Sequence, residues 1–392
     1  MNVSNYRRKY ESELLERTIP FWEKNCQDRK FGGYFTSLDR DGSVYDDKKY
    51  MWMQWRIVYM FATLSMSQYG KKKWLDIARR GFDFLVKNGK SKDGYYYFAL
   101  NRDGTPSVAP YSIFSDCFAA MGSAALFKAT GENRYRTEAE KAMKNYIGRM
   151  GNPKLQWEKS LAGSTRRHNL GQYMILANLG LVMKDCLGTD AYDRETASAV
   201  DFVMEKFWNP KFKVIFENVN EDGTFDLNSS DGRHINPGHG LESMWFILKY
   251  AELNGRKDLL KPACDAIAGL MEFGWDKKNG GMYYFMDVLD KPHIELQANM
   301  KLWWVHNEAL VALLYAYRIT GKDVFKEWFE KTDAWTWKHY PDKKYGEWYG
   351  YLDRQGNVTH RLKGGKWKSF FHLPRFLLEG IGQLDMIQNH NS

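Results

Sequence analysis

Two kinds of apolar segment alternate along the chain. One kind, such as 71–88, carries a charged face opposite an apolar face, and the other kind, such as 51–68, is apolar almost all round. A helix with one apolar face covers a core, whereas a helix that is apolar on every side is itself buried. The predicted outer and inner helices pair in chain order as 5–25 with 51–68, 71–88 with 112–130, 134–149 with 168–185, 192–208 with 237–254, 256–273 with 302–320, and 323–339 with 368–387. Six such pairs predict an all-α protein, an (α/α)6 barrel of six inner and six outer helices.

A short aromatic motif that ends in a turn recurs between these helices. It reads G-G-Y-F-T-S-L-D-R-D-G at 32–42 and G-E-W-Y-G-Y-L-D-R-Q-G at 346–356. Further copies lie at 93–104, 214–223 and 279–290. Aromatic residues followed by an Asp-Gly type turn predict a strand or short β-hairpin in each copy. The copies recur about every 65 residues, apart from one gap twice as long, so a sixth, degenerate copy is expected at 155–163.

The repeat runs through the chain without a linker or a shift in composition, so we expect residues 1–392 to form a single domain. The net charge is +9, but the basic residues are dispersed among 48 acidic residues, which argues against nucleic-acid binding. The four cysteines form no C-x-x-C pair, which is typical of reduced thiols in a cytoplasmic protein. The first residues lack an apolar signal core, and no run of 18 apolar residues occurs, so no membrane partner is expected.

Polar residues collect at one position of the repeat, near the start of the predicted inner helices. They are Arg56, Asp116, His239, Glu242, Glu308 and His372, with His168, Asn169 and Gln172 at a similar phase in the third repeat. Aromatic residues surround them in the sequence: Trp52, Trp55, Trp303, Trp304, Trp367 and Phe371. Charges buried together in an apolar barrel are costly. Convergent polar groups in an aromatic cavity are the usual pattern of a binding site, so this site is predicted at one mouth of the barrel.

The stretch 234–245, H-I-N-P-G-H-G-L-E-S-M-W, shows how such a position is built. The turn residues 236–238 place His239 in the first turn of a helix, and Glu242 follows on the same face. We therefore expect the carboxylate of Glu242 to fix the tautomer of His239 and to tune its basicity.

The chemistry that fits these residues is proton transfer at carbon. The sequence contains no H-E-x-x-H, no clustered Cys/His ligands, no P-loop and no G-x-S-x-G elbow, so we predict no metal site. Two histidines, His239 and His372, can remove a proton from a carbon beside a carbonyl and return one to the opposite face. Arg56 can stabilise the enediolate intermediate.

Two other classes of function remain open on the residues alone. A glycoside hydrolase on the same barrel would use paired carboxylates, for which Glu242 and Glu308 are the candidates. A non-catalytic sugar-binding scaffold would use the aromatic residues, but it gives no role to the histidine pair. The residues that we expect to contact the sugar are Trp303, Trp304, Asp116, His306, Trp367 and Gln172.

Three segments carry a family resemblance. I-N-P-G-H-G-L-E-S-M-W at 235–245, K-L-W-W-V-H-N-E-A-L at 301–310 and G-G-K-W-K-S-F-F-H-L-P-R at 364–375 resemble the signature segments of N-acyl-D-glucosamine 2-epimerases. The resemblance implies an (α/α)6 barrel that interconverts N-acetylglucosamine and N-acetylmannosamine at C2. It also implies that His239, His372, Arg56, Glu242 and Glu308 are the catalytic residues.

The same resemblance implies a cytoplasmic homodimer that acts on a small amino sugar, often in sialic-acid metabolism. It implies no cofactor for the chemistry and allows ATP as an allosteric activator. Cellobiose 2-epimerases and mannose-type aldose–ketose isomerases share the barrel and the histidine pair, and they are the alternative readings. The family's more usual W-W-P-H appears here with Val305 in place of the proline.

Overall fold

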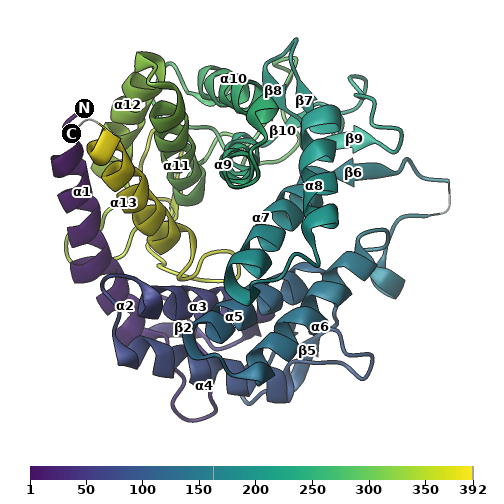
Figure 1. The fold of residues 1–392 in the computed structure, drawn as a ribbon, viewed down its shortest axis with the longest axis vertical. Coiled ribbons are helices and arrows are strands. Elements are labelled where there is room, and N and C mark those ends of the chain that lie inside the picture. Colours follow the sequence, from purple (N-terminus) through teal and green to yellow (C-terminus); the bar gives the residue numbers. More distant parts are fainter. Residues whose placement is uncertain (162, 391–392) are drawn as a thin grey trace.

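The computed structural model describes residues 1–161 and 163–390 and places their helices in two concentric rings (Figure 1). The inner ring contains α3 (Met51–Met66), α5 (Phe114–Thr130), α7 (Leu170–Leu187), α9 (Pro237–Asn254), α11 (Trp303–Thr320) and α13 (His372–His390). These are the segments that are apolar on nearly all sides, and most of their residues are buried. Their bounds agree with the predicted ranges to within a few residues, and the predicted (α/α)6 barrel is confirmed.

The outer ring contains the amphipathic helices. Its first member consists of α1 (Val3–Ser12), a π-helical turn at Glu13–Thr18 and α2 (Ile19–Asn25). The other members are α4 (Lys72–Asn88), α6 (Asn133–Arg149), α8 (Asp193–Phe202) with its π-helical extension Val203–Phe207, α10 (Lys257–Gly274) and α12 (Asp323–His339). A charged face turned to water and an apolar face turned inward explain why these helices lie outside.

The first and last helices close the ring. Figure 1 shows α1 packed beside α13. The Nε of Arg7 lies 2.5 Å from Oδ1 of Asp385, which links the two helices directly. The hydroxyl of Tyr10 donates to Oδ1 of Asp333 on α12 at 2.8 Å. Residues more than 300 positions apart in the sequence therefore complete the barrel.

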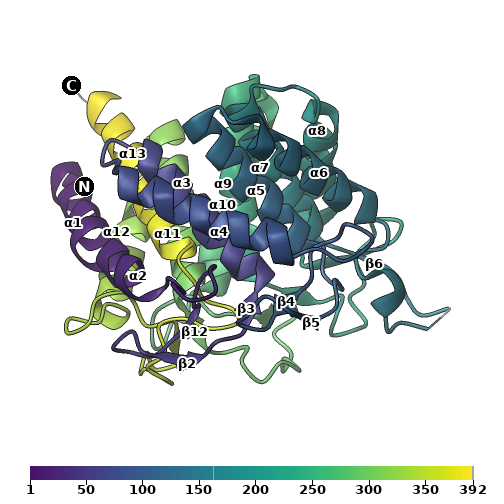
Figure 2. The ribbon, with the colours of Figure 1, turned by 90° about the horizontal axis from the view of Figure 1, so that it is seen from below.

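Short strands join each repeat to the next. The strand that precedes an inner helix pairs antiparallel with a strand about 50 residues further on. These pairs are β3 (Lys49–Tyr50) with β4 (Ala99–Leu100), β6 (Arg167–Asn169) with β9 (Asn218–Asn220), β10 (His234–Ile235) with β11 (Met286–Asp287), and β12 (Lys301–Leu302) with β13 (Tyr351–Leu352). Figure 2 shows these strands and their loops gathered at one end of the barrel, where the inner helices begin. We call this end the mouth.

The five predicted aromatic motifs each contain a strand and a tight turn. Two of them form local hairpins, in which β1 (Ser37–Leu38) pairs with β2 (Val44–Asp46), and β4 pairs with β5 (Pro106–Val108). In the third copy β8 (Val214–Ile215) pairs with the preceding β7 (Trp208–Asn209). The turn glycines Gly42, Gly104, Gly223 and Gly356 all have positive φ, which explains their recurrence.

The prediction of a sixth copy of the motif at 155–163 is wrong for the described residues. Leu155–Trp157 forms a 3-10 turn, and no strand follows in 158–161. The carboxylate of Glu158 instead accepts hydrogen bonds from the backbone N–H groups of Lys159 and Ser160, which favours a local turn. Residue 162 lies outside the described residues. No helix in 1–161 or 163–390 is long and apolar enough to cross a membrane.

Candidate active site

A cavity of about 620 Å³ opens at the mouth of the barrel. All six inner helices contribute to its walls, and loop residues such as Tyr284 and Gln297 line it nearer the mouth. Of the residues predicted for the site, Arg56, His239, Glu242, Trp303, Trp304, Trp367 and His372 line this cavity. Glu308 lies directly behind His372, as described below. All six inner helices begin at this end, four of them directly after a strand, which is why residues far apart in the sequence meet here.

His239 stands in the first turn of α9 and is oriented by a carboxylate from another repeat. The side chain of Asn236 caps the helix by accepting the backbone N–H of His239 at 3.2 Å. Nδ1 of His239 lies 3.0 Å from both carboxylate oxygens of Glu217, which follows β8. Asn169 donates to the same carboxylate at 3.2 Å. Because Nδ1 donates to Glu217, the other ring nitrogen, Nε2, is left for the substrate.

The prediction that Glu242 fixes the tautomer of His239 is therefore wrong. Glu242 binds Arg375 of α13 instead, in a buried ion pair. An i, i+3 spacing on a helix allows contact but does not require it, and the guanidinium of Arg375 competes for this carboxylate. Glu217 takes the expected role from outside the helix.

His372 is held by a second carboxylate. Its Nδ1 lies 2.8 Å from Oε1 of Glu308, and the indole N–H of Trp245 donates to Oε2 of Glu308 at 2.8 Å. Nη2 of Arg375 donates to Oε1 of Glu308 at 2.6 Å. Arg375 thus joins Glu242 and Glu308 at the floor of the site. Nε2 of His372 is again the ring nitrogen without a carboxylate partner.

The two histidines have opposite protonation tendencies. Burial and the neighbouring cations Arg56 and Arg375 lower the pKa of His372 well below 6.5, so its ring is neutral at physiological pH. Burial disfavours the charged form of His239 as well, but the carboxylate of Glu217 outweighs it and raises the pKa of His239 above 6.5. The site therefore contains one imidazole whose surroundings favour the neutral, proton-accepting form and one whose surroundings favour the charged, proton-donating form.

Arg56 lies in an aromatic cage formed by Trp52, Phe118 and Phe371. Its guanidinium carbon lies 4.6, 4.2 and 4.5 Å from these three ring centroids. No carboxylate of the described residues forms an ion pair with it, and its Nε has no hydrogen-bond partner among them. Burial lowers the pKa of Arg56 to about 9, which leaves it charged at neutral pH. A buried, charged and unpaired guanidinium is available for a negative charge that develops in the cavity.

One indole ring touches both histidines. The ring centroid of Trp304 lies 5.2 Å from that of His239 and 5.6 Å from that of His372. Trp304 follows Trp303 in the first turn of α11, between the two histidine-bearing helices in the ring. The indole gives a sugar ring an apolar surface against which to stack. The two imidazoles border the same surface.

Glu242, Glu308 and His372 bring possible metal ligands within 4.8 Å of one another. Arg375 already lies among them and donates to both carboxylates. A positive charge therefore occupies the position that a cation would take. These residues fit an orienting network better than a metal site.

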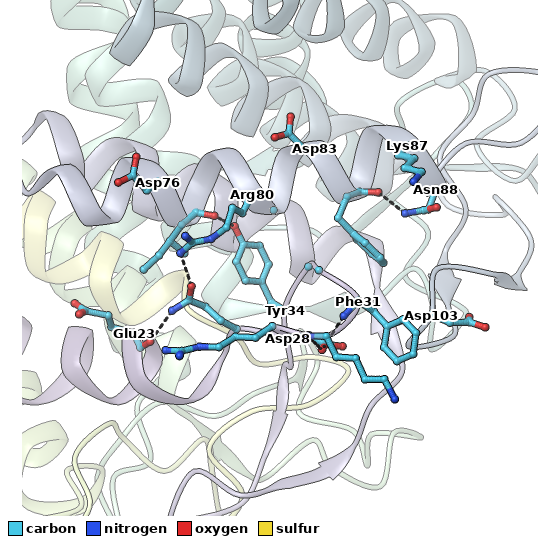
Figure 3. Close-up of a pocket in the computed structure, with 18 of the residues that line it drawn as sticks. Glu23, Asp28, Phe31, Tyr34, Asp76, Arg80, Asp83, Lys87, Asn88 and Asp103 are labelled. Atoms are coloured by element: carbon cyan, nitrogen blue, oxygen red, sulfur yellow. Dashed lines mark hydrogen bonds between the residues drawn. The ribbon is translucent and has the colours of Figure 1, made fainter.

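A second hollow, more open and larger at about 1140 Å³, lies on the outside of the barrel against α4 (Figure 3). Its polar groups bind mainly one another. Arg80 donates to Gln27 at 2.7 Å, and the hydroxyl of Tyr34 donates to the carbonyl of Ile77 at 2.9 Å. Asp28 is paired with the buried Lys49 at 3.0 Å. Among the described residues that line this hollow there is no histidine, so the proton-transfer chemistry predicted from the sequence belongs to the cavity at the mouth.

Residues 33–375 match the sequence model of the N-acylglucosamine 2-epimerase (GlcNAc 2-epimerase) family. The chain belongs to this family. It is therefore an enzyme, a carbohydrate epimerase of the isomerase class.

Known epimerases resemble the chain over nearly its whole length. The N-acylglucosamine 2-epimerase of Mus musculus is 37% identical over 381 residues, which cover 95% of this chain and 90% of that protein. The N-acylglucosamine 2-epimerase of Homo sapiens is 34% identical over 379 residues, covering 93% and 86%. The cellobiose 2-epimerase of Dictyoglomus turgidum is more distant, at 23% identity over 95% of this chain and 98% of that protein.

Solved structures share the barrel of this epimerase. The cellobiose 2-epimerase from Bacillus thermoamylovorans superposes with a TM-score of 0.84 at 19% identity, covering 97% of this chain and 99% of that one. A D-mannose isomerase superposes equally well, with a TM-score of 0.84 at 18% identity and 97% and 100% coverage. At these identities the superpositions establish the fold.

Three residues predicted to contact the sugar do not line the cavity of the epimerase. Asp116 is fully buried and pairs with Arg149 of α6 at 3.2 Å, and burial raises its pKa to about 6. His306 accepts the backbone N–H of Met282 at 2.9 Å and lies 2.8 Å from the carbonyl of Leu302. Both face away from the cavity, because each lies two positions from a cavity-lining residue and positions two apart on a helix lie on different faces.

Gln172 also lies outside the cavity. Its carbonyl accepts the hydroxyl of Tyr146 on α6 at 2.7 Å, which places this part of α7 against the outer ring. Its neighbours Gly171 and Met174 line the cavity in its place. Of the polar residues expected at this phase in the third repeat, Asn169 lines the cavity and Gln172 does not.

Glu217 and Arg375 were not predicted as site residues. Arg375 carried a local signal, since it lies three residues after His372 on the same helix and ends the third resemblance segment. Glu217 carried none. It lies within the aromatic motif at 214–223, and only the pairing of neighbouring repeats brings its carboxylate to His239.

Proposed function

We propose that the enzyme interconverts N-acetyl-D-glucosamine and N-acetyl-D-mannosamine by proton transfer at C2. The observation that carries the proposal is the pair of carboxylate-oriented imidazoles, His239 and His372, that border one indole in the cavity. Inversion at a carbon requires a base on one side and an acid on the other. The relatives of Mus musculus and Homo sapiens, which are named N-acylglucosamine 2-epimerases, support the choice of substrate.

The proton transfer starts from the open-chain sugar, in which C2 adjoins the C1 aldehyde. Nε2 of neutral His372 takes the C2 proton, and the C–H electron pair forms the C1–C2 double bond while negative charge moves to O1. Nε2–H of His239 then donates its proton to C2 from the other face as the C1 carbonyl reforms. The products are the C2 epimer, neutral His239 and protonated His372, and proton exchange with water resets the pair. The reverse reaction uses the two histidines in exchanged roles.

Arg56 is proposed to stabilise the charge on O1. Its guanidinium is buried, unpaired among the described residues and held by three aromatic rings, so it needs little rearrangement when the negative charge appears. Glu217 and Glu308 stabilise the imidazolium forms of the two histidines in turn. This chemistry requires no cofactor.

We also propose that the enzyme is a cytoplasmic homodimer and that its N-acetylmannosamine enters sialic-acid metabolism, as the family resemblance implies. The four cysteines are free and buried, in agreement with a reducing compartment. Sedimentation velocity tests the dimer, for which we expect twice the mass of the chain.

ATP as an allosteric activator is tested by comparing initial rates with ATP, with a non-hydrolysable analogue and without nucleotide. Equal rates in all three would remove this part of the proposal.

Proton NMR of the enzyme with N-acetylmannosamine in D2O tests the main proposal. We expect N-acetylglucosamine to appear with deuterium at C2. Exchange or turnover with cellobiose or mannose alone would keep the chemistry and assign a different sugar. No exchange with any of the three, with or without ATP, would contradict the epimerase mechanism.

His239→Ala and His372→Ala should each lose epimerisation while their circular dichroism spectra stay unchanged, and activity in either variant would contradict the two-base mechanism.

A further inference from the structure

The cavity has two walls of different character. Helices α9 and α13 contribute His239, Glu242, His372 and Arg375, the groups with the proton-transfer chemistry, and α11 between them contributes two tryptophans. Helices α5 and α7 lie across the ring from α11 and α13 (Figure 1). Their cavity-lining side chains are mainly apolar: Phe114, Phe118, Met121, Met174 and Ile175. A sugar that stacks on Trp304 of α11 therefore turns its other side toward an apolar wall.

One polar group interrupts this apolar wall. Asn178 of α7 lines the cavity and is half-buried. Among residues 1–161 and 163–390, no side chain or backbone group forms a hydrogen bond with its side-chain amide. Asn178 follows Met174 by four positions and Ile175 by three, so the three side chains share one face of the helix. A half-buried amide without a partner among the described residues is free to pair with a ligand that offers both a donor and an acceptor.

The wall also contains open space near the start of α7. Gly171 lines the cavity, and a Cβ added there would meet only Oδ1 of Asn169 at 3.0 Å and the ring of Phe114 at 3.8 Å. Methionine side chains at 121 and 174 are unbranched and adapt to the shape of a small apolar group. The space between α5 and α7 therefore suits a short alkyl group attached to something that can hydrogen-bond.

We propose that this wall is the N-acyl subsite, in which Asn178 pairs with the substrate amide and Met121 and Met174 contact the acyl chain. An N-acyl group on C2 has this composition: one N–H, one C=O and one methyl, all within a few bonds of the reacting carbon. The side-chain amide of Asn178 can accept from the substrate N–H and donate to its carbonyl. The subsite rests on the proposed function, because it assumes that C2 lies beside Trp304 and the histidines.

The subsite determines which sugars the enzyme distinguishes. A sugar with a hydroxyl at C2 leaves the methionines without contact and pairs less completely with Asn178. A longer acyl chain presses on Met174 and Met121 rather than on the catalytic groups, so chain length is expected to affect KM more than kcat. Asn178 is thus a specificity-determining residue, and its loss is expected to weaken substrate binding while the proton-transfer groups remain in place.

Kinetics with a series of acyl chains test this assignment. Wild-type enzyme, Asn178→Ala and Met174→Ala are each assayed with N-acetyl-, N-propanoyl- and N-butanoylmannosamine by C2 deuterium incorporation. We expect Asn178→Ala to raise KM for all three about 10-fold or more, with kcat changed much less. We expect Met174→Ala to favour the longer chains, reversing the wild-type order of kcat/KM. Gln172→Ala, on the same helix but outside the cavity, is the matched control and should behave as wild type.

A direct contact is measured on His372→Ala, which is expected to bind without turnover. With ¹³C-methyl-labelled methionine, the N-acetyl methyl of N-acetylmannosamine should give NOEs to two methionine methyls that disappear in Met121→Leu and Met174→Leu respectively. Absence of these NOEs together with an unchanged acyl order in Met174→Ala would overturn the subsite. If wild-type enzyme incorporates no deuterium into any N-acylmannosamine, the proposed function fails first, so the two failures are distinguishable.

Discussion

His239 and His372 have the same side chain, yet their surroundings shift their pKa values in opposite directions. Each donates Nδ1–H to a carboxylate, Glu217 in one case and Glu308 in the other. The carboxylate of Glu308 is shared with the cation Arg375, whereas that of Glu217 accepts a hydrogen bond from the neutral Asn169. The nearby cations therefore keep His372 neutral, and the less compensated Glu217 favours the charged form of His239.

The pH dependence of kcat/KM should depend on the negative charge of Glu217. In the direction in which His239 donates the proton, activity is present below the raised pKa of His239 and is lost as pH rises through it. Glu217→Gln removes the charge that raises this pKa, so the alkaline limb of kcat/KM should move to lower pH. The measurement is a pH–rate profile, with the exposed Glu221→Gln as a control of equal chemistry. An alkaline limb at the same pH in Glu217→Gln would assign that limb to another group.

Arg56 should not tolerate replacement by lysine. The planar guanidinium stacks on three rings, and a lysine ammonium is smaller, more strongly hydrated and differently shaped. We expect Arg56→Lys to lower kcat by about 10²-fold, the typical effect of losing one group that stabilises an oxyanion, with a nearly unchanged melting temperature. Near-normal turnover would leave Arg56 with a structural role only.

At the scale of elements, the segment 288–300 between β11 and β12 forms part of the cavity mouth. Gln297 and Met300 of this segment line the cavity. His293 contacts His234 of β10 through a ring-nitrogen pair 2.7 Å apart, and its Nδ1 accepts the backbone N–H of Glu295 at 3.0 Å. His293 must therefore carry its proton on Nε2 and donate it to His234. The pair fastens the segment to the strand that leads into α9.

Loss of this hydrogen bond should loosen the segment. His293→Ala is expected to speed amide hydrogen exchange in 288–300 and to raise KM, because the lining residues lose their fixed position. Leu296→Ala, in the same segment but 98% exposed, is the control and should leave both unchanged. Exchange rates in 288–300 that are equal in His293→Ala and wild type would mean that the backbone alone holds the segment.

At the scale of the whole molecule, a buried carboxyl group lies where the first and last repeats meet. Glu13, in the π-helical turn between α1 and α2, is 4% exposed and accepts the indole N–H of Trp348 at 3.0 Å. Burial raises its pKa from 4.5 to about 7. The stabilising effect of the protonated form is fully present below pH 4.5 and is lost as pH rises through about 7.

Glu13→Gln should therefore stabilise the barrel at high pH. Glutamine retains an acceptor for Trp348 and removes the buried charge, so we expect a gain of about 1–3 kcal/mol in the free energy of unfolding at pH 8. Near pH 5 the difference should be small. Thermal or urea unfolding at the two pH values measures it, with the exposed Glu16→Gln of the same turn as control. An equal effect at both pH values would mean that Glu13 is not protonated in the fold.

The sequence by itself determined the barrel. Segments that are apolar on all sides alternate with amphipathic ones, and this pattern has few solutions other than an inner and an outer ring. The same repeat placed His239, His372, Arg56 and Glu308 at one phase, so it predicted that they lie at the same end of the barrel, where the structure has them. Aromatic motifs with turn glycines predicted the strands but not their partners.

Only the tertiary structure decided which residues pair. Glu217 rather than Glu242 orients His239, and both Asp116 and His306 face away from the cavity. These outcomes depend on helix rotations of a fraction of a turn and on strands paired across repeats. Local spacing does not determine these, because one helix position can face the cavity while a near neighbour faces the outer ring. The chain pattern thus fixed the kinds of residue at the mouth, and long-range packing fixed which of them contact one another.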